Sequence, residues 1–136
     1  FDRNGEIHAL SVTHVMRPQD SPWSGSVGYS HVENRTVGAD FRSAGDGLSG
    51  AVRYSFSRRT DLTVGGNVGR DRYKSANSLT GFARRDRPAS VFVQLNGPLS
   101  ENLRYFVQVQ ANHSRSNTTF YDYEQRTVLG GIGAEF

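Results

Sequence analysis

Four histidines are the first residues in this chain whose type and spacing could do chemistry. His8 and His14 lie an even number of residues apart in one alternating segment, so they share a strand face. His31 and Glu33 share a face of the next segment in the same way. Side chains six residues apart on a strand are separated by roughly 20 Å, whereas the ligands of one zinc ion all lie about 2 Å from the metal. The pattern therefore predicts ordinary polar strand residues and no metal site.

Nucleophilic and cofactor chemistry have few residues to use. The chain has no cysteine, which excludes a thiol nucleophile, a disulfide framework and cysteine metal ligands. Residues 45–50, GDGLSG, are rich in glycine but lack the lysine and the following helix of a phosphate-binding loop. We predict a turn at this position and no cofactor in the chain.

The elements that must position the remaining polar residues are β-strands. With 15 Gly, 8 Phe and 6 Tyr among 136 residues, the composition suits strands and turns, and residues 1–136 are expected to form one domain or part of one. Apolar and polar residues alternate in about seven segments, which predicts an all-β fold. The predicted strands lie near residues 6–16, 26–34, 48–57, 62–70, 89–96, 103–112 and 126–136.

The two faces of these strands differ in polarity. In the four clearest strands one face is apolar and free of charge, and the opposite face collects polar side chains. We expect this second face to line an interior, with the lining residues Arg53, Asn67, Gln94, Arg104, Gln108 and Gln110. A soluble barrel and a membrane barrel both permit the pattern.

Residues 125–136, QRTVLGGIGAEF, alternate up to a terminal aromatic residue. This closing segment resembles the last strand of bacterial outer-membrane β-barrels. The resemblance implies location in the bacterial outer membrane, contact with outer-membrane lipid and lipopolysaccharide, and recognition by the barrel-assembly machinery. The residues that would carry this assembly signal are Gly130, Ile132, Ala134 and Phe136.

Connection lengths point to the same architecture. We expect short connections at 58–61 and 97–102, and long ones at 35–47, 71–88 and 113–124. Short and long connections then lie on opposite rims, as in membrane barrels, and the short rim is where Phe136 ends. Four aromatic residues are expected near that rim as a girdle: Tyr54, Phe56, Tyr105 and Phe136. The prediction is an antiparallel up-and-down transmembrane β-barrel.

The number of strands predicts that the barrel is incomplete. Bacterial single-chain barrels have an even number of strands with both ends in the periplasm. With Phe136 at the short-connection rim, seven strands place the start of the first strand, near Glu6, at the opposite rim. We therefore predict the C-terminal part of a larger barrel, whose remaining strands come from a longer chain or from other copies of this chain.

Average properties limit the partners. A mean hydropathy of −0.58, with no apolar run near the ~18 residues that a membrane helix needs, excludes a helical membrane protein. The net charge of +3 and pI near 9.6 are spread over scattered basic residues without a basic face, so no nucleic-acid partner is expected. Arg84, Arg85 and Arg87 surround Asp86; they predict a solvated loop, with contact to lipopolysaccharide phosphate as the alternative.

A barrel with a polar interior suggests a channel, and two other functional classes remain open. His113, Ser114 and Glu124 resemble the His, Ser and Glu of barrel-embedded lipid A-modifying hydrolases, but there the His and Ser are two residues apart and share a face. Because His113 and Ser114 are adjacent, we expect no catalysis. A soluble β-barrel that binds a small apolar ligand also remains open, and expression as a detergent-free monomer would favour it.

A second resemblance favours a role in transport. Residues 121–126, YDYEQR, run directly into the closing strand. This arrangement resembles C-terminal barrels attached to periplasmic repeat domains, such as surface-lipoprotein assembly modifiers and exopolysaccharide export barrels. It implies a polar-lined pore or an export channel and names no cargo.

Overall fold

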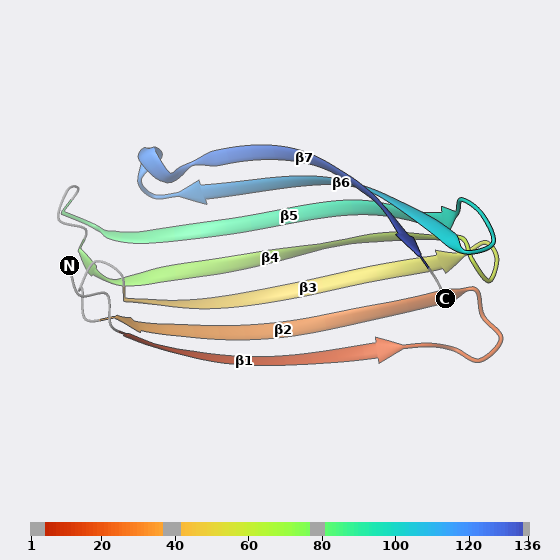
Figure 1. Cartoon of the computed structure of the whole chain (residues 1–136). Helices are drawn as coiled ribbons and strands as arrows, with labels where there is room; N and C mark the ends of the chain where they lie inside the picture. Colours follow the sequence, from red (N-terminus) through yellow and green to blue (C-terminus); the bar gives the residue numbers. More distant parts are fainter. Residues whose placement is uncertain (1–4, 37–41, 77–80, 135–136) are drawn as a thin grey trace.

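The chain forms one antiparallel sheet of seven strands, ordered in space as in the sequence (Figure 1). The computed structural model describes residues 5–36, 42–76 and 81–134. The strands are β1 (Gly5–Met16), β2 (Trp23–Thr36), β3 (Ser43–Ser55), β4 (Asp61–Ala76), β5 (Ala83–Pro98), β6 (Leu103–Ser116) and β7 (Tyr123–Ala134), and a short 3-10 helix, η2 (Thr119–Tyr121), precedes β7. The predicted all-β, up-and-down topology with seven strands is confirmed.

Each strand pairs with the next one along the chain. The β3–β4 hairpin is in register from Ser55 opposite Asp61 to Ser43 opposite Tyr73, as the alternating pattern predicts. β1 and β7 do not pair with each other, so the sheet is open along both edges. None of the described residues belongs to a helix long and apolar enough to cross a membrane.

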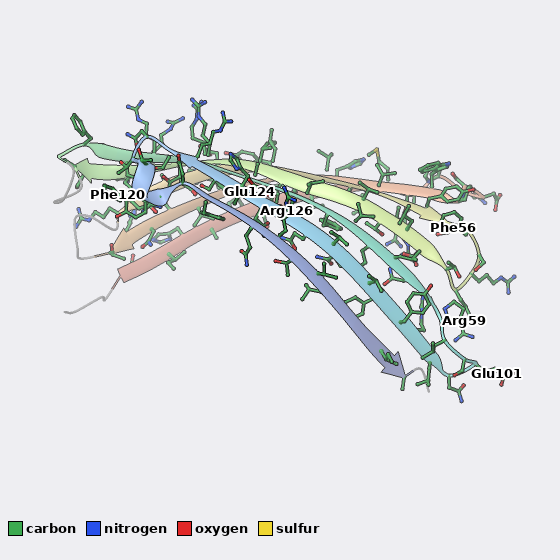
Figure 2. The ribbon with its side chains drawn as sticks, turned by 90° about the horizontal axis from the view of Figure 1, so that it is seen from above. Phe56, Arg59, Glu101, Phe120, Glu124 and Arg126 are labelled. Atoms are coloured by element: carbon green, nitrogen blue, oxygen red, sulfur yellow. The ribbon has the colours of Figure 1, made fainter. Side chains whose placement is uncertain are left out.

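The predicted contrast between short and long connections is wrong. Links 17–22, 56–60 and 99–102 join strand ends at one end of the sheet, the strand ends joined by 37–42, 77–82 and 117–122 lie at the other, and every link has four to six residues. At the first end the side chain of Arg59 donates to the carbonyl oxygens of Ser100 and Glu101, which ties two neighbouring links together (Figure 2).

Segments that we expected to be loops are strand ends. Residues 71–76 and 83–88 extend β4 and β5, the glycine-rich residues 45–50 lie inside β3 rather than in a turn, and Arg84 to Arg87 belong to β5 rather than to a solvated loop. These segments carry polar residues on both faces, so they lack the apolar alternation on which the prediction depended. Ladder hydrogen bonds to paired neighbours hold them extended instead.

Burial in this sheet is inverted relative to a water-soluble domain. Among the described residues no hydrophobic side chain is buried, and the buried polar or charged residues are Asp61, Asp86 and Ser114. A row of five valines runs across β3 to β7, and each is 42% exposed or more: Val52, Val64, Val93, Val109 and Val128. The sheet therefore has no apolar core of its own.

At most of its glycines the polar face is the more crowded one, although Gly66 and Gly97 on the apolar face also have close neighbours. A Cβ added at Gly65, on the polar face, would lie 2.8 Å from the Phe92 ring and 2.9 Å from the Ala51 Cβ atom. A Cβ at Gly50, on the apolar face, would meet nothing nearer than 3.6 Å. Side chains converge on the concave side of a curved sheet and spread on the convex side, and Figure 2 shows the sheet strongly curved. We therefore call the polar face concave and the apolar face convex.

Candidate functional site

The six residues expected to line an interior share the concave face. Arg53 lies opposite Thr63, Thr63 opposite Gln94, and Gln94 opposite Gln108. The other three follow at even spacings in the same strands: Asn67 in β4, and Arg104 and Gln110 in β6. Because strand side chains alternate, this register puts all six on one side of four neighbouring strands.

Asp61, the first residue of β4, connects several side chains of this face, and the sequence pattern did not identify it. Its side chain is 5% exposed; its Oδ2 accepts a hydrogen bond from Arg53 Nη2 at 2.7 Å and lies 3.9 Å from Arg104 Nη2. Asn96 Nδ2 donates to the other oxygen, Oδ1, at 2.9 Å. The carboxylate thus links β3, β5 and β6. Asp61 lies two residues before Thr63 and shares its face, but residues 58–61 were expected to form a link, so Asp61 was not predicted to lie on the polar face.

Side-chain amides continue the network along the strands. Gln94 donates to Asn96 at 3.0 Å, whereas in β6 Gln108 donates to Gln110 at 3.1 Å and Gln110 to Asn112 at 2.8 Å. Each bond joins residues two apart on the same face, so the amides form ordered ladders rather than independent polar groups. Satisfied in this way, the amides form a rigid hydrophilic lining.

A groove of 400 Å³ lies over Asp61, between Arg53 and Arg104, with Gln94 and Asn96 on its wall. Two guanidinium groups and one carboxylate give this groove an excess of positive charge. Its groups can donate and accept hydrogen bonds, so the groove suits a hydrated or anionic solute. It offers no nucleophile activated by a base.

A second polar cluster lies on the concave face at the far ends of β4 and β5. The guanidinium group of Arg84 donates to both carboxylate oxygens of Asp86, at 3.0 and 2.8 Å, and lies over the Tyr73 and Tyr121 rings. Asp71 is directly opposite Asp86. Burial, and next the Asp86 charge, raise the pKa of Asp71 above its usual range, whereas Arg84 opposes that shift.

The residues considered for catalysis and metal binding do not converge. His113 is exposed on the convex face opposite Glu124, and Ser114 is buried on the concave face opposite Tyr123. The ring of His113 accepts a hydrogen bond from Arg115 at 3.2 Å. No group of three or more His, Asp or Glu residues in the described part of the chain could hold a metal ion.

Aromatic residues gather on the convex face near links 17–22 and 56–60. Trp23 begins β2, ahead of the predicted strand 26–34, and its ring centre is 4.6 Å from that of Tyr54, which in turn is 4.9 Å from that of Phe56. The Tyr105 ring lies over Gly97, where an added Cβ would meet its hydroxyl group at 2.7 Å. These contacts group three aromatic residues at one end of the sheet.

The closing strand is described only in part. Gly130 and Ile132 lie on the convex face of β7, opposite Val107 and Tyr105, and Ala134 is opposite Leu103. Phe136 lies outside the described residues, so the structure does not bear on its expected place in the girdle or in the assembly signal.

Fold and site together define an antiparallel meander with an exposed apolar face and a networked polar face. Comparison with known proteins adds no identity to this class: no protein family, no curated protein and no solved structure matches the chain.

Proposed function

We propose that the chain is a segment of a bacterial outer-membrane β-barrel whose concave face lines a polar pore or an export channel, without catalysis. The observation that carries the proposal is the inverted burial: valines of the central strands are exposed on the convex face, while Asp61 is 3% exposed on the concave face. An apolar outside and a polar inside is the arrangement that a hydrocarbon solvent requires.

Strand length supports a membrane setting. The strands have 12 to 16 residues, more than the about 9 to 11 that cross a bilayer at a tilt. On the convex face the excess is charged: in β4, Leu62, Val64 and Val68 are followed by Arg70, Arg72 and Lys74. We call the apolar part of the convex face, from Leu62 to Val68 and its cross-strand neighbours, the apolar band. It would contact the hydrocarbon, and the charged ends would lie outside it.

The open edges imply further strands. An unpaired strand edge is not tolerated in hydrocarbon because its N–H and C=O groups have no water to bond. In the proposed membrane setting β1 and β7 therefore pair with strands of a longer chain or of other copies of this chain. Assembly machinery that recognises the closing strand would act through Gly130, Ile132, Ala134 and Phe136.

The concave face also weighs against a soluble barrel that holds a small apolar ligand. Such a ligand needs an apolar interior, whereas the lining here consists of guanidinium, carboxylate and amide groups around Asp61.

The test is the ion conductance of the native assembly, purified in detergent and inserted into planar bilayers. We expect discrete conductance steps, and Arg53→Gln should shift the reversal potential toward cations because it removes a lining charge. Arg58→Gln, which removes the same charge from a link, is the control and should leave selectivity unchanged. A native protein that stays water-soluble without detergent and produces no conductance would contradict the proposal.

A further inference from the structure

Five arginines gather on the convex face where β4, β5 and β6 run beyond the apolar band. Arg70 and Arg72 come from β4, Arg85 and Arg87 from β5, and Arg115 from β6; all are exposed, and we call them the arginine cluster. They line a cavity of 570 Å³. The sequence shows only scattered basic residues here, because the cluster forms through the pairing of three strands.

Like charges in the cluster lie directly opposite one another. Arg72 is the cross-strand partner of Arg85, and Arg87 is the partner of Arg115. Directly opposed like charges destabilise an antiparallel pair. A sheet that concentrates five guanidinium groups in this way is stabilised by an anion that neutralises them.

Nearby carboxylates offset this charge only in part: hydrogen bonds from His31 and Tyr29, and last the Arg72 charge, lower the pKa of Asp46. Asp46 is the cross-strand partner of Arg70, but its Oδ1 accepts from the Tyr29 hydroxyl at 2.7 Å and lies 2.9 Å from His31 Nδ1. Asp86 is engaged by Arg84. In the described part of the chain, no carboxylate forms an ion pair with any member of the arginine cluster.

The cluster begins where the apolar band ends. Arg70 follows Val68 by two residues on the same face, and Arg87 precedes Ala89, the partner of Val68, by two. Two residues span about 7 Å along a strand, so a barrel with its apolar band in the hydrocarbon holds these guanidinium groups at headgroup depth. One guanidinium group can bind two phosphate oxygens at once, and a phosphate monoester carries a charge of about −1.5 to −2.

We propose that the arginine cluster binds the phosphate groups of an anionic membrane lipid, with a headgroup carrying two phosphate monoesters as the best match to five positive charges. This site rests on the proposed membrane function, because the apolar band fixes its depth. The lipid would neutralise the opposed arginines and would hold β4, β5 and β6 together at the barrel surface.

The experiment measures lipid binding to the native assembly by native mass spectrometry in a zwitterionic detergent. The probe is diphosphoryl lipid A, with monophosphoryl lipid A and inorganic pyrophosphate as comparisons. The double variant Arg85→Gln/Arg87→Gln should bind diphosphoryl lipid A at least about tenfold more weakly, because charge-assisted hydrogen bonds are lost. Arg17→Gln/Arg58→Gln removes equal charge from links at the opposite rim and should bind like the native protein.

A second readout separates a binding role from a merely structural one. Without lipid, the Arg85→Gln/Arg87→Gln variant should melt at a higher temperature than the native protein, because opposed charges are gone. With diphosphoryl lipid A the order should reverse, because only the native protein gains stability from the ligand.

Equal lipid affinity of the double variant and the control would overturn the proposal. Pyrophosphate that displaces diphosphoryl lipid A at equal concentration would also overturn it, because the site would then select free phosphate. In a further outcome, the native assembly binds the lipid and the double variant does not, yet the native assembly shows no conductance. That result would support the lipid site and refute the pore.

Discussion

The two faces of β4, β5 and β6 offer a comparison within one molecule. On the convex face Val64, Val93 and Val109 form a row with no polar contact, and each is exposed. In the next row, on the concave face, Gln94 and Gln108 belong to a hydrogen-bonded network, and Thr63 lies beside Gln94. The comparison teaches that a side-chain period of two lets one backbone serve two environments, provided that each face meets the right solvent.

The strongest test of this comparison places one charge on either face. If the proposed membrane barrel holds, Val107→Arg should destabilise the assembly by roughly 2 to 4 kcal/mol, because the guanidinium group would enter the hydrocarbon near its midplane. Gln108→Arg, one residue along β6, should fold normally and change ion selectivity. Urea unfolding of the assembly in lipid vesicles measures the stability of each variant. Equal stabilities of the two variants would contradict the membrane setting of the convex face.

A smaller effect is expected at Asp61, at the end of the concave face near link 56–60. Asp61→Asn leaves the guanidinium groups of Arg53 and Arg104 without the carboxylate that they share, and should cost about 1 to 3 kcal/mol. The same change should move the proposed pore toward anion selectivity. Unfolding free energy and reversal potential are the measurements. Glu101→Gln in an exposed link is the control, and a concave variant indistinguishable from it would show that Asp61 does not organise the lining.

Crowding gives a test in which no charge changes. Gly65→Ala should destabilise the sheet by about 1 to 3 kcal/mol, because the new methyl group overlaps the Phe92 ring and the Ala51 Cβ atom. Gly50→Ala on the convex face has room and should be neutral, or should stabilise by up to about 1 kcal/mol. Thermal unfolding compares them. Equal effects would mean that the polar face is not the concave one.

The smallest effect concerns the charged end of β2, outside the apolar band. Lys74, then Arg35, lower the pKa of Glu33 from 4.5 to about 2. A lowered pKa in the folded state means that this carboxylate stabilises the fold above about pH 4.5 and loses its contribution as pH falls toward 2. Unfolding midpoints recorded from pH 2 to 7 should fall less steeply below about pH 4.5, the acid limb of the curve, in Glu33→Gln than in the native protein. An unchanged acid limb would mean that the pair contributes nothing.

Much of the fold was predictable from alternation alone. Apolar residues at every second position fixed the number of strands, their order and the faces of Arg53, Gln94 and Gln108. Strand ends 71–76 and 83–88 were missed because charges occupy both of their faces, so no apolar period marks them. Pairing with neighbouring strands keeps these ends extended, and a single stretch of sequence does not display that pairing.

The site was less predictable than the fold. Alternation predicted that six polar residues share a face, and the register puts them on one, but alternation gives no position along the strands. Asp61 gains its role from Arg53 in β3, Asn96 in β5 and Arg104 in β6, which are brought together only by register. The arginine cluster depends in the same way on the pairing of Arg72 with Arg85 and of Arg87 with Arg115.

The amide ladders have a direction. Gln94 and Gln108 are cross-strand partners, and because β5 and β6 are antiparallel, the chain of donors that starts at Gln94 and the one that starts at Gln108 run toward opposite rims. Each ladder begins with a donated N–H, so both leave a side-chain carbonyl oxygen at the same central level. Two sets of amide dipoles thus diverge from the middle of the sheet: one ends at the Asp61 carboxylate, which accepts from Asn96, and the other ends at Asn112 toward the opposite rim.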